Sequence, residues 1–209
     1  MSPARLAGWA LVFFAFIAPI ILHSTRSLLL ASSAGPPDAA PPTCGCHGSD
    51  AVKATIEITG LPANGFTPGD TYDLKVKVSD PDRTVAADAA WGFELIVAGG
   101  PALGDVGTAG GTLTVTDATN TQLSNNRYLK QTTAGTFAGA QTGSAEWSFK
   151  WTAPNLAQVR FWAAGNSANN NGDTSGDHIA FLPRTVLSKM EPVATARSSW
   201  GRIKAAYRQ

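Results

Sequence analysis

Charged residues and cysteines are both scarce in this 209-residue chain. Asp, Glu, Lys and Arg make up 15% of the sequence, against about 25% in typical soluble proteins. The two cysteines, Cys44 and Cys46, share one tetrapeptide, which excludes the disulfide framework of a small secreted domain. Between residues 44 and 188, nine basic residues stand against thirteen acidic ones. We do not expect nucleic-acid binding from a region with that charge balance.

The sequence also lacks the usual signatures of catalysis. It holds three histidines and neither a G-x-S-x-G nor an H-E-x-x-H motif. There is no glycine-rich phosphate loop between a strand and a helix. The sequence therefore gives little support to an enzyme, and we expect the protein not to be one.

One long hydrophobic run lies near the N-terminus. Leu6 to Leu22 is uncharged and 17 residues long. As a helix it would reach about 25 Å, slightly less than the hydrocarbon core of a bilayer. A cleaved signal peptide remains an alternative, with LLLASSA at 28–34 as the cleavage region. We favour a retained single-pass anchor over residues 1–31, in a bacterial inner membrane.

A proline-rich linker at 32–49 follows the run, and it would hold the main domain in the periplasm. The main domain is expected at 50–185, where helical periodicity is almost absent and apolar and polar residues alternate. About seven strands are predicted, near 54–59, 72–78, 91–98, 111–116, 146–152, 159–163 and 178–182. The fold class is therefore all-β, an immunoglobulin-like antiparallel β-sandwich. One face of the strand predicted at 146–152 carries Trp147, Phe149 and Trp151. We expect these side chains to fill the core between the two sheets.

An Asn-rich loop at 165–177 gathers side-chain oxygens. Asn166, Asn171, Asp173 and Asp177 are weak calcium candidates, because the run only loosely resembles a D-x-N-x-D loop. A tight turn is the alternative, since Asn and Gly accept positive φ.

The one motif that carries chemistry is TCGCHG at 43–48. Cys44, Cys46 and His47 form a C-x-C-H cluster, close to the C-x-x-C-H motif through which haem c is attached. The cluster is one residue short, and this should strain or block one of the two thioether bonds.

Several segments together resemble a known family: PGDTYDLKVKV at 68–78, GFEL at 92–95, WSFKWTAP at 147–154, VRFWAAGN at 159–166 and SGDHI at 175–179. They are similar to extracytoplasmic bacterial proteins in which a choice-of-anchor V, reeler-like domain follows a C-x-x-C-H motif. The resemblance implies the sandwich fold, export and, in many members, a c-type haem.

A second departure from the family also bears on haem. Gln131 opens QTTAGT at 131–136, where family members often have His as a plausible distal ligand. An amide in place of imidazole removes the usual sixth ligand of the iron. We therefore expect no cofactor, with Cys44, Cys46 and His47 vestigial or structural. Haem c on these residues is the main alternative, followed by zinc or copper and by a local disulfide.

The C-terminal tail at 186–209 is basic and unlike the domain. Trp200, Ile203 and Tyr207 have helical spacing among basic residues, which predicts a short amphipathic helix. It would dock on anionic lipid headgroups or on an acidic partner, and a frayed C-terminus is the alternative. In the N-terminal run, aromatic side chains would pack against neighbouring subunits: Trp9, Phe13 and Phe16.

These features lead to competing functional hypotheses. The first is an accessory or structural subunit of a multisubunit membrane complex, in contact with other subunits and membrane lipids. An electron-transfer assembly, photosynthetic or respiratory, is the expected host, by analogy with the cytochrome character of the resembled family. The alternative is a monohaem c-type cytochrome at the periplasmic membrane surface, and a weaker third is an adhesive or ligand-binding module.

Overall fold

The computed structural model describes residues 53–100 and 107–191. The cluster at Cys44, Cys46 and His47 lies outside these residues. So do the expected docking residues of the N-terminal run and of the tail: Trp9, Phe13, Phe16, Trp200, Ile203 and Tyr207. Within 53–100 and 107–191, no helix is both long and apolar enough to cross a membrane.

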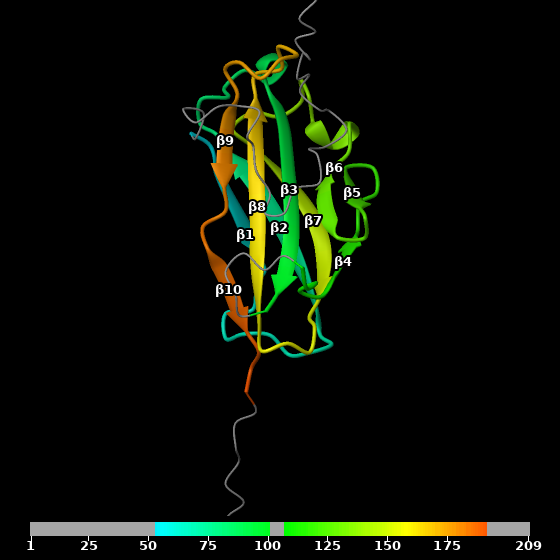
Figure 1. Ribbon diagram of the computed structural model, residues 1–209. Helices are drawn as coiled ribbons and strands as arrows, with labels where there is room; N and C mark the ends of the chain where they lie inside the picture. The colour runs from blue at the N-terminus through cyan, green and yellow to red at the C-terminus, as the bar shows by residue number, and fades with distance from the viewer. Residues whose placement is uncertain (1–52, 101–106, 192–209) are drawn as a thin grey trace, which may run out of the picture.

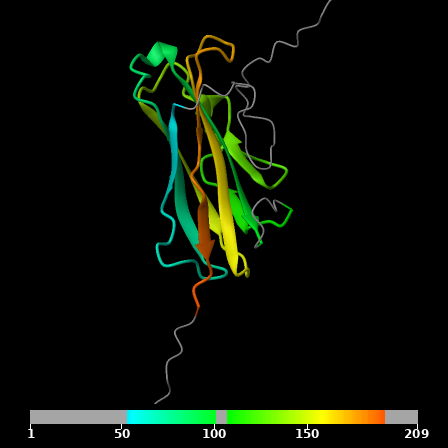
Figure 2. The same ribbon diagram turned by 60° about the vertical axis from the view of Figure 1, so that its left-hand side comes forward.

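Two antiparallel sheets face each other (Figures 1 and 2). The smaller sheet has the order β1 (Thr55–Thr59), β2 (Thr71–Ser79), β7 (Ser144–Thr152), β4 (Thr112–Val115). The larger has the order β10 (Thr185–Ser188), β8 (Gln158–Ala168), β3 (Ala90–Gly99), β6 (Tyr128–Gln131), β5 (Thr121–Ser124), and β9 (His178–Phe181) also pairs with β8. Helical structure among the described residues is limited to the 3-10 turns η3 (Ala86–Asp88) and η4 (Ala134–Thr136). The expectation of an all-β antiparallel sandwich is confirmed.

Aromatic side chains fill the space between the sheets. Trp147, Phe149 and Trp151 of β7 are at most 2% exposed, as the period-two pattern predicts. Phe93 of β3 packs against Trp147 at 4.6 Å between ring centroids, and Phe161 of β8 meets Trp151 edge-on at 5.1 Å. These contacts join the centre of the larger sheet to the centre of the smaller one.

Three strands were not predicted from the sequence. β5 and β6 form a hairpin whose turn holds Asn125 and Asn126 at φ values of 51° and 53°. Their sequences are short and mostly polar, so period-two alternation gives little signal. β10 is four residues long and lies astride the boundary expected at residue 185 between sandwich and tail. The described residues thus form ten strands, where about seven were expected.

The described chain begins and ends at opposite ends of the sandwich. The backbone N–H groups of Lys53 and Ala54 donate to the carbonyl of Ile179 in β9, near the upper end in Figure 1. At the lower end, β10 is followed by Met190, whose N–H donates to the carbonyl of Phe66. The view in Figure 2 shows the same separation.

Candidate functional site

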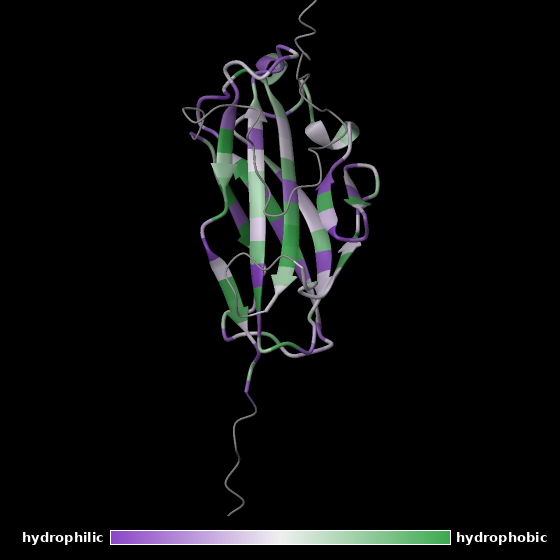
Figure 3. Cartoon of the chain, viewed as in Figure 1, coloured by the Kyte–Doolittle hydropathy of each residue, from purple (hydrophilic) through white to green (hydrophobic). Residues whose placement is uncertain are grey.

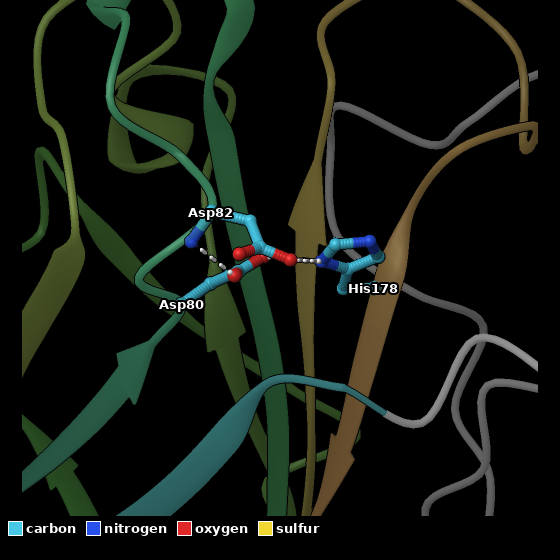
Figure 4. A group of neighbouring side chains, drawn as sticks. All are labelled: Asp80, Asp82 and His178. Carbon is cyan, nitrogen blue, oxygen red and sulfur yellow. Dashed lines mark hydrogen bonds and ion pairs between the residues drawn. The ribbon is translucent and has the colours of Figure 1, made fainter.

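A buried carboxylate organises the upper end of the sandwich. Asp80 follows β2 and is 1% exposed. Its Oδ2 lies 2.7 Å from Ser167 Oγ of β8 and 2.7 Å from His178 Nδ1 of β9. Its Oδ1 accepts from the backbone N–H of Asp82 at 3.0 Å. Figure 4 shows Asp80 and Asp82, which follow β2, facing His178 of β9.

Arg83 completes this polar cluster. Its guanidinium donates to Ser167 Oγ at 3.2 Å and to the carbonyl oxygens of Ser167 and Gly176 at 2.9 and 2.6 Å. Its Nε lies 3.7 Å from Asp80 Oδ2. We define the Asp80 cluster as Asp80, Asp82, Arg83, Ser167 and His178. The cluster joins the end of β2 in one sheet to β8 and β9 in the other.

Hydrogen bonding keeps Asp80 ionised. Burial acts to raise the pKa of its carboxyl group, but hydrogen bonds from Ser167, the Asp82 backbone and His178, together with the charge of His178, outweigh burial and lower the pKa. An ionised carboxylate can only accept hydrogen bonds. The Ser167 hydroxyl and the His178 Nδ1–H must therefore both donate to it.

This proton arrangement differs from that of a hydrolytic triad. In such a triad the serine hydroxyl donates to the histidine, and the histidine donates to the aspartate. Here Ser167 and His178 both donate to the same oxygen of Asp80. Since Ser167 is also fully buried, the cluster holds elements together and does not present an activated nucleophile.

Three residues of the Asp80 cluster could in principle bind a metal ion. They are the group of potential metal ligands found within the described residues, 53–100 and 107–191. Ligand atoms of Asp80, Asp82 and His178 lie within 4.8 Å of one another. A divalent cation there would have to displace the hydrogen bonds to Asp80 and sit beside the positive charge of Arg83. Calcium and magnesium need about six or more oxygen ligands, and the nearby guanidinium charge opposes the binding of a cation. The donor set therefore fits a metal poorly.

The Asn-rich loop folds on its own side chains. Asn166 Nδ2 and the backbone N–H of Asn169 donate to the two oxygens of Asp177, at 3.2 and 3.1 Å. Asn171 Nδ2 donates to Asp173 Oδ1 at 3.1 Å, and Asp173 Oδ1 also accepts from the N–H of Ser175 at 2.7 Å. Asn170 has a φ of 56°. The calcium prediction for Asn166, Asn171, Asp173 and Asp177 stays a prediction. Oxygens of Asn171, Asp173 and Asp177 already accept hydrogen bonds within the loop, whereas Asn166 Oδ1 is buried without a hydrogen-bond partner among the described residues.

Gln131 is the one residue of the haem hypothesis that the structure describes. It is 4% exposed at the end of β6, and its Oε1 accepts from the backbone N–H of Phe93 at 2.8 Å. Its Nε2 lies close to Gly92, where a Cβ would approach it to 2.9 Å. Backbone pairing joins β6 to β3 at only two residue pairs. At the next position along β3, the Gln131 side chain accepts the hydrogen bond from the Phe93 N–H that a backbone carbonyl would otherwise accept.

Sequence reasoning missed Asp80, Arg83 and Ser167. A signal was present in SDPDR at 79–83, where a turn with alternating carboxylates follows an amphipathic strand. Nothing local indicates that Asp80 is buried, because its partners lie 87 and 98 residues further along the chain. His178 belongs to the SGDHI segment at 175–179, and the structure places its side chain against Asp80.

Comparisons with known proteins return structural neighbours only. No protein-family model matches the chain, and no curated protein matches it. The reeler domain of human F-spondin is similar over 66% of this chain and 90% of its own, with 17% identity and a TM-score of 0.44. AvmM, which catalyses macrocyclization in alchivemycin A biosynthesis, is similar over 69% and 92%, with 13% identity and a TM-score of 0.41. The major pilin SpaD from Corynebacterium diphtheriae is similar over 64% and 35%, with 14% identity and a TM-score of 0.40.

Proposed function

We propose that this protein is a membrane-anchored β-sandwich of the choice-of-anchor V, reeler-like kind. It serves as a non-enzymatic accessory subunit of a multisubunit membrane complex, on the periplasmic face of a bacterial inner membrane. The observation that carries the proposal is the placement of the two chain ends. The described chain starts near the Asp80 cluster and finishes at the other end of the sandwich.

This placement suits a subunit that joins two attachment points. β8 has 11 residues and runs along the sandwich, and at about 3.3 Å per residue it is about 36 Å long. The anchor at 1–31 is linked to one end, and the tail with Trp200, Ile203 and Tyr207 continues from the other. In this proposal the tail contacts a partner subunit, because aromatic anchors supply much of the affinity of an interface.

The chemistry of the Asp80 cluster supports a non-enzymatic role. Its serine and histidine protons are both donated to Asp80, and Arg83 is held by backbone carbonyls. Such a network contributes stability and a unique packing arrangement, as satisfied buried polar networks do.

The proposed host is an electron-transfer assembly, respiratory or photosynthetic. This part of the proposal rests on the family resemblance of the sequence, in which a haem-attachment motif precedes the domain. The shortened C-x-C-H cluster and Gln131 favour a member that has kept the scaffold and lost the haem. The monohaem cytochrome is the second candidate, since Cys44, Cys46 and His47 retain three of the groups that such a cofactor needs.

Purification of the full chain from mildly solubilised membranes tests both candidates. We expect a stable set of membrane proteins to co-purify, and no Soret band and no haem mass increment on the polypeptide. A Soret band with the mass increment would establish the cytochrome instead. A full chain that is recovered alone from mild detergent, without haem, would contradict both.

A further inference from the structure

The outward surfaces of the two sheets differ in chemistry. The smaller sheet presents ion pairs across its strands: Lys75 Nζ lies 2.6 Å from Glu146 Oε1, and Lys150 Nζ lies 2.7 Å from Asp73 Oδ1. These side chains are between 43% and 80% exposed. Polar side chains on the outer face of an antiparallel sheet are typical of a surface in contact with water.

The outward surface of the larger sheet is mostly apolar. Trp91, Phe93, Leu95 and Val97 of β3 belong to the core, so the residues between them point the other way. Three of those outward residues are Glu94, Ile96 and Ala98, at 2%, 0% and 3% exposure, and Ala164 of β8 is at 3%. Figure 3 shows β3 and β8 apolar or neutral over most of their length.

These four residues, Glu94, Ile96, Ala98 and Ala164, form what we call the outer patch. They are buried as deeply as the core although they face away from it. In the part of the chain that the structure describes, no strand or loop crosses this face of β3 and β8 (Figures 1 and 2). At the margin of the patch, Phe181 of β9 stands opposite Ala164 and is 46% exposed.

The path of the chain brings the N-terminal segment to this surface. Lys53 and Ala54 are bonded to the carbonyl of Ile179 in β9. Ile179 pairs with Asn166 of β8, and its neighbour Ala180 points into the core, so Ile179 lies on the outward side. Residues before Lys53 thus approach the larger sheet at its β9 edge, beside the outer patch.

The distances show that residues before Lys53 can reach the patch. From Ile179 to Ala164 is one strand across and two residues along, about 8 Å at the usual spacings of a sheet. Ile96 pairs with Trp162, so it lies two strands across and four residues along, about 16 Å away. About five extended residues span that distance. The ten residues at 43–52, TCGCHGSDAV, are long enough and mostly small.

We propose that residues 43–52 dock on the outer patch. Small residues suit this surface because they can pack closely against Ala98 and Ala164 of the sheet. Docking holds Cys44, Cys46 and His47 against the larger sheet instead of leaving them on a free linker. It also leaves residues 32–42 as the linker between the proposed anchor and the sandwich. The inference is independent of the host complex and of haem.

Thiol labelling of the full chain in mild detergent tests the docking. Two variants are made in a Cys44→Ser, Cys46→Ser background, one with Gly48→Cys and one with Ser49→Cys, so that each has a single thiol. Adjacent residues of an extended segment face opposite sides, and at least one thiol should be covered. We expect that thiol to react with maleimide at least about tenfold more slowly than in the urea-unfolded chain, because it reacts only when the segment opens.

Ala164→Glu should restore fast labelling, since it puts a charge under the segment. Phe181→Glu at the exposed margin is a second variant in case Ala164→Glu fails to fold, and circular dichroism checks both. Thr114→Glu, exposed on the smaller sheet, is the matched control and should leave the rate unchanged.

The proposal is overturned if both thiols of the parent variants react at the unfolded rate. It is equally overturned if protection survives the charge on the patch, which would place the segment elsewhere. Protection that appears only as the protein concentration rises would identify a second copy of the chain as the occupant.

Discussion

Asp80→Asn should destabilise the protein by about 3 kcal/mol. The substitution keeps the shape of the side chain but removes the charge that accepts from Ser167 and His178. Hydrogen bonds to charged groups contribute about 1.5–3 kcal/mol each, and the variant amide can still accept one of them. The NH2 group of the introduced asparagine would face the other of the two donors, Ser167 or His178. Arg83 would also lose the carboxylate that lies beside its guanidinium. Losing one partner of a buried pair costs about 3–5 kcal/mol, which bounds the effect from above.

Urea unfolding of the full chain, followed by tryptophan emission, measures this loss. With a slope of about 2 kcal/mol/M, a 3 kcal/mol change lowers the midpoint by about 1.5 M. Asp73→Asn is the matched control, because Asp73 is 80% exposed where it pairs with Lys150. That control should change the free energy of unfolding by less than about 1 kcal/mol. If Asp80→Asn lowered the free energy of unfolding no more than Asp73→Asn does, the Asp80 cluster would not stabilise the fold as the structure indicates.

The pH dependence gives an independent check on the charge of Asp80. Its pKa is lowered in the folded state, so its stabilising contribution is complete above the unfolded pKa of about 4 and is lost as the pH falls through the folded value. The difference in unfolding free energy between the wild type and Asp80→Asn should therefore narrow below about pH 4. A difference that stays constant down to pH 2 would show that the charge is not its source.

Three further outcomes are expected. Trp151→Ala should lower the free energy of unfolding by about 3–5 kcal/mol, because it leaves a large cavity in the core; calorimetry or urea titration measures the loss. A loss below about 1 kcal/mol would mean that neighbouring side chains repack to fill the cavity. Cys44→Ser with Cys46→Ser should leave the far-ultraviolet circular dichroism and co-purification nearly unchanged, and loss of a covalent chromophore would refute this. Deleting residues 192–209 should reduce retention in the complex at high salt without changing the melting temperature; undiminished co-purification would show that the tail is a bystander.

Several features could be predicted from local sequence. Period-two alternation located β2 and β7, and the aromatic side chains of β7 are in the core as expected. Alternation works there because each strand has one face toward the core and one toward water. It failed for β5 and β6, which are short and largely polar and which depend on pairing with each other and with β3.

The sequence by itself determined the fold class, since strand periodicity and turn residues are local properties. The candidate site was different. Asp80, Ser167 and His178 carry no motif, and they meet only because β2 and β8 end, and β9 begins, at the same end of the sandwich. The burial of Glu94, Ile96 and Ala164 on an outward face likewise arises only in the folded chain. Tertiary structure decided both, because burial and long-range hydrogen bonds depend on which strands become neighbours and not on the residues that precede and follow each position.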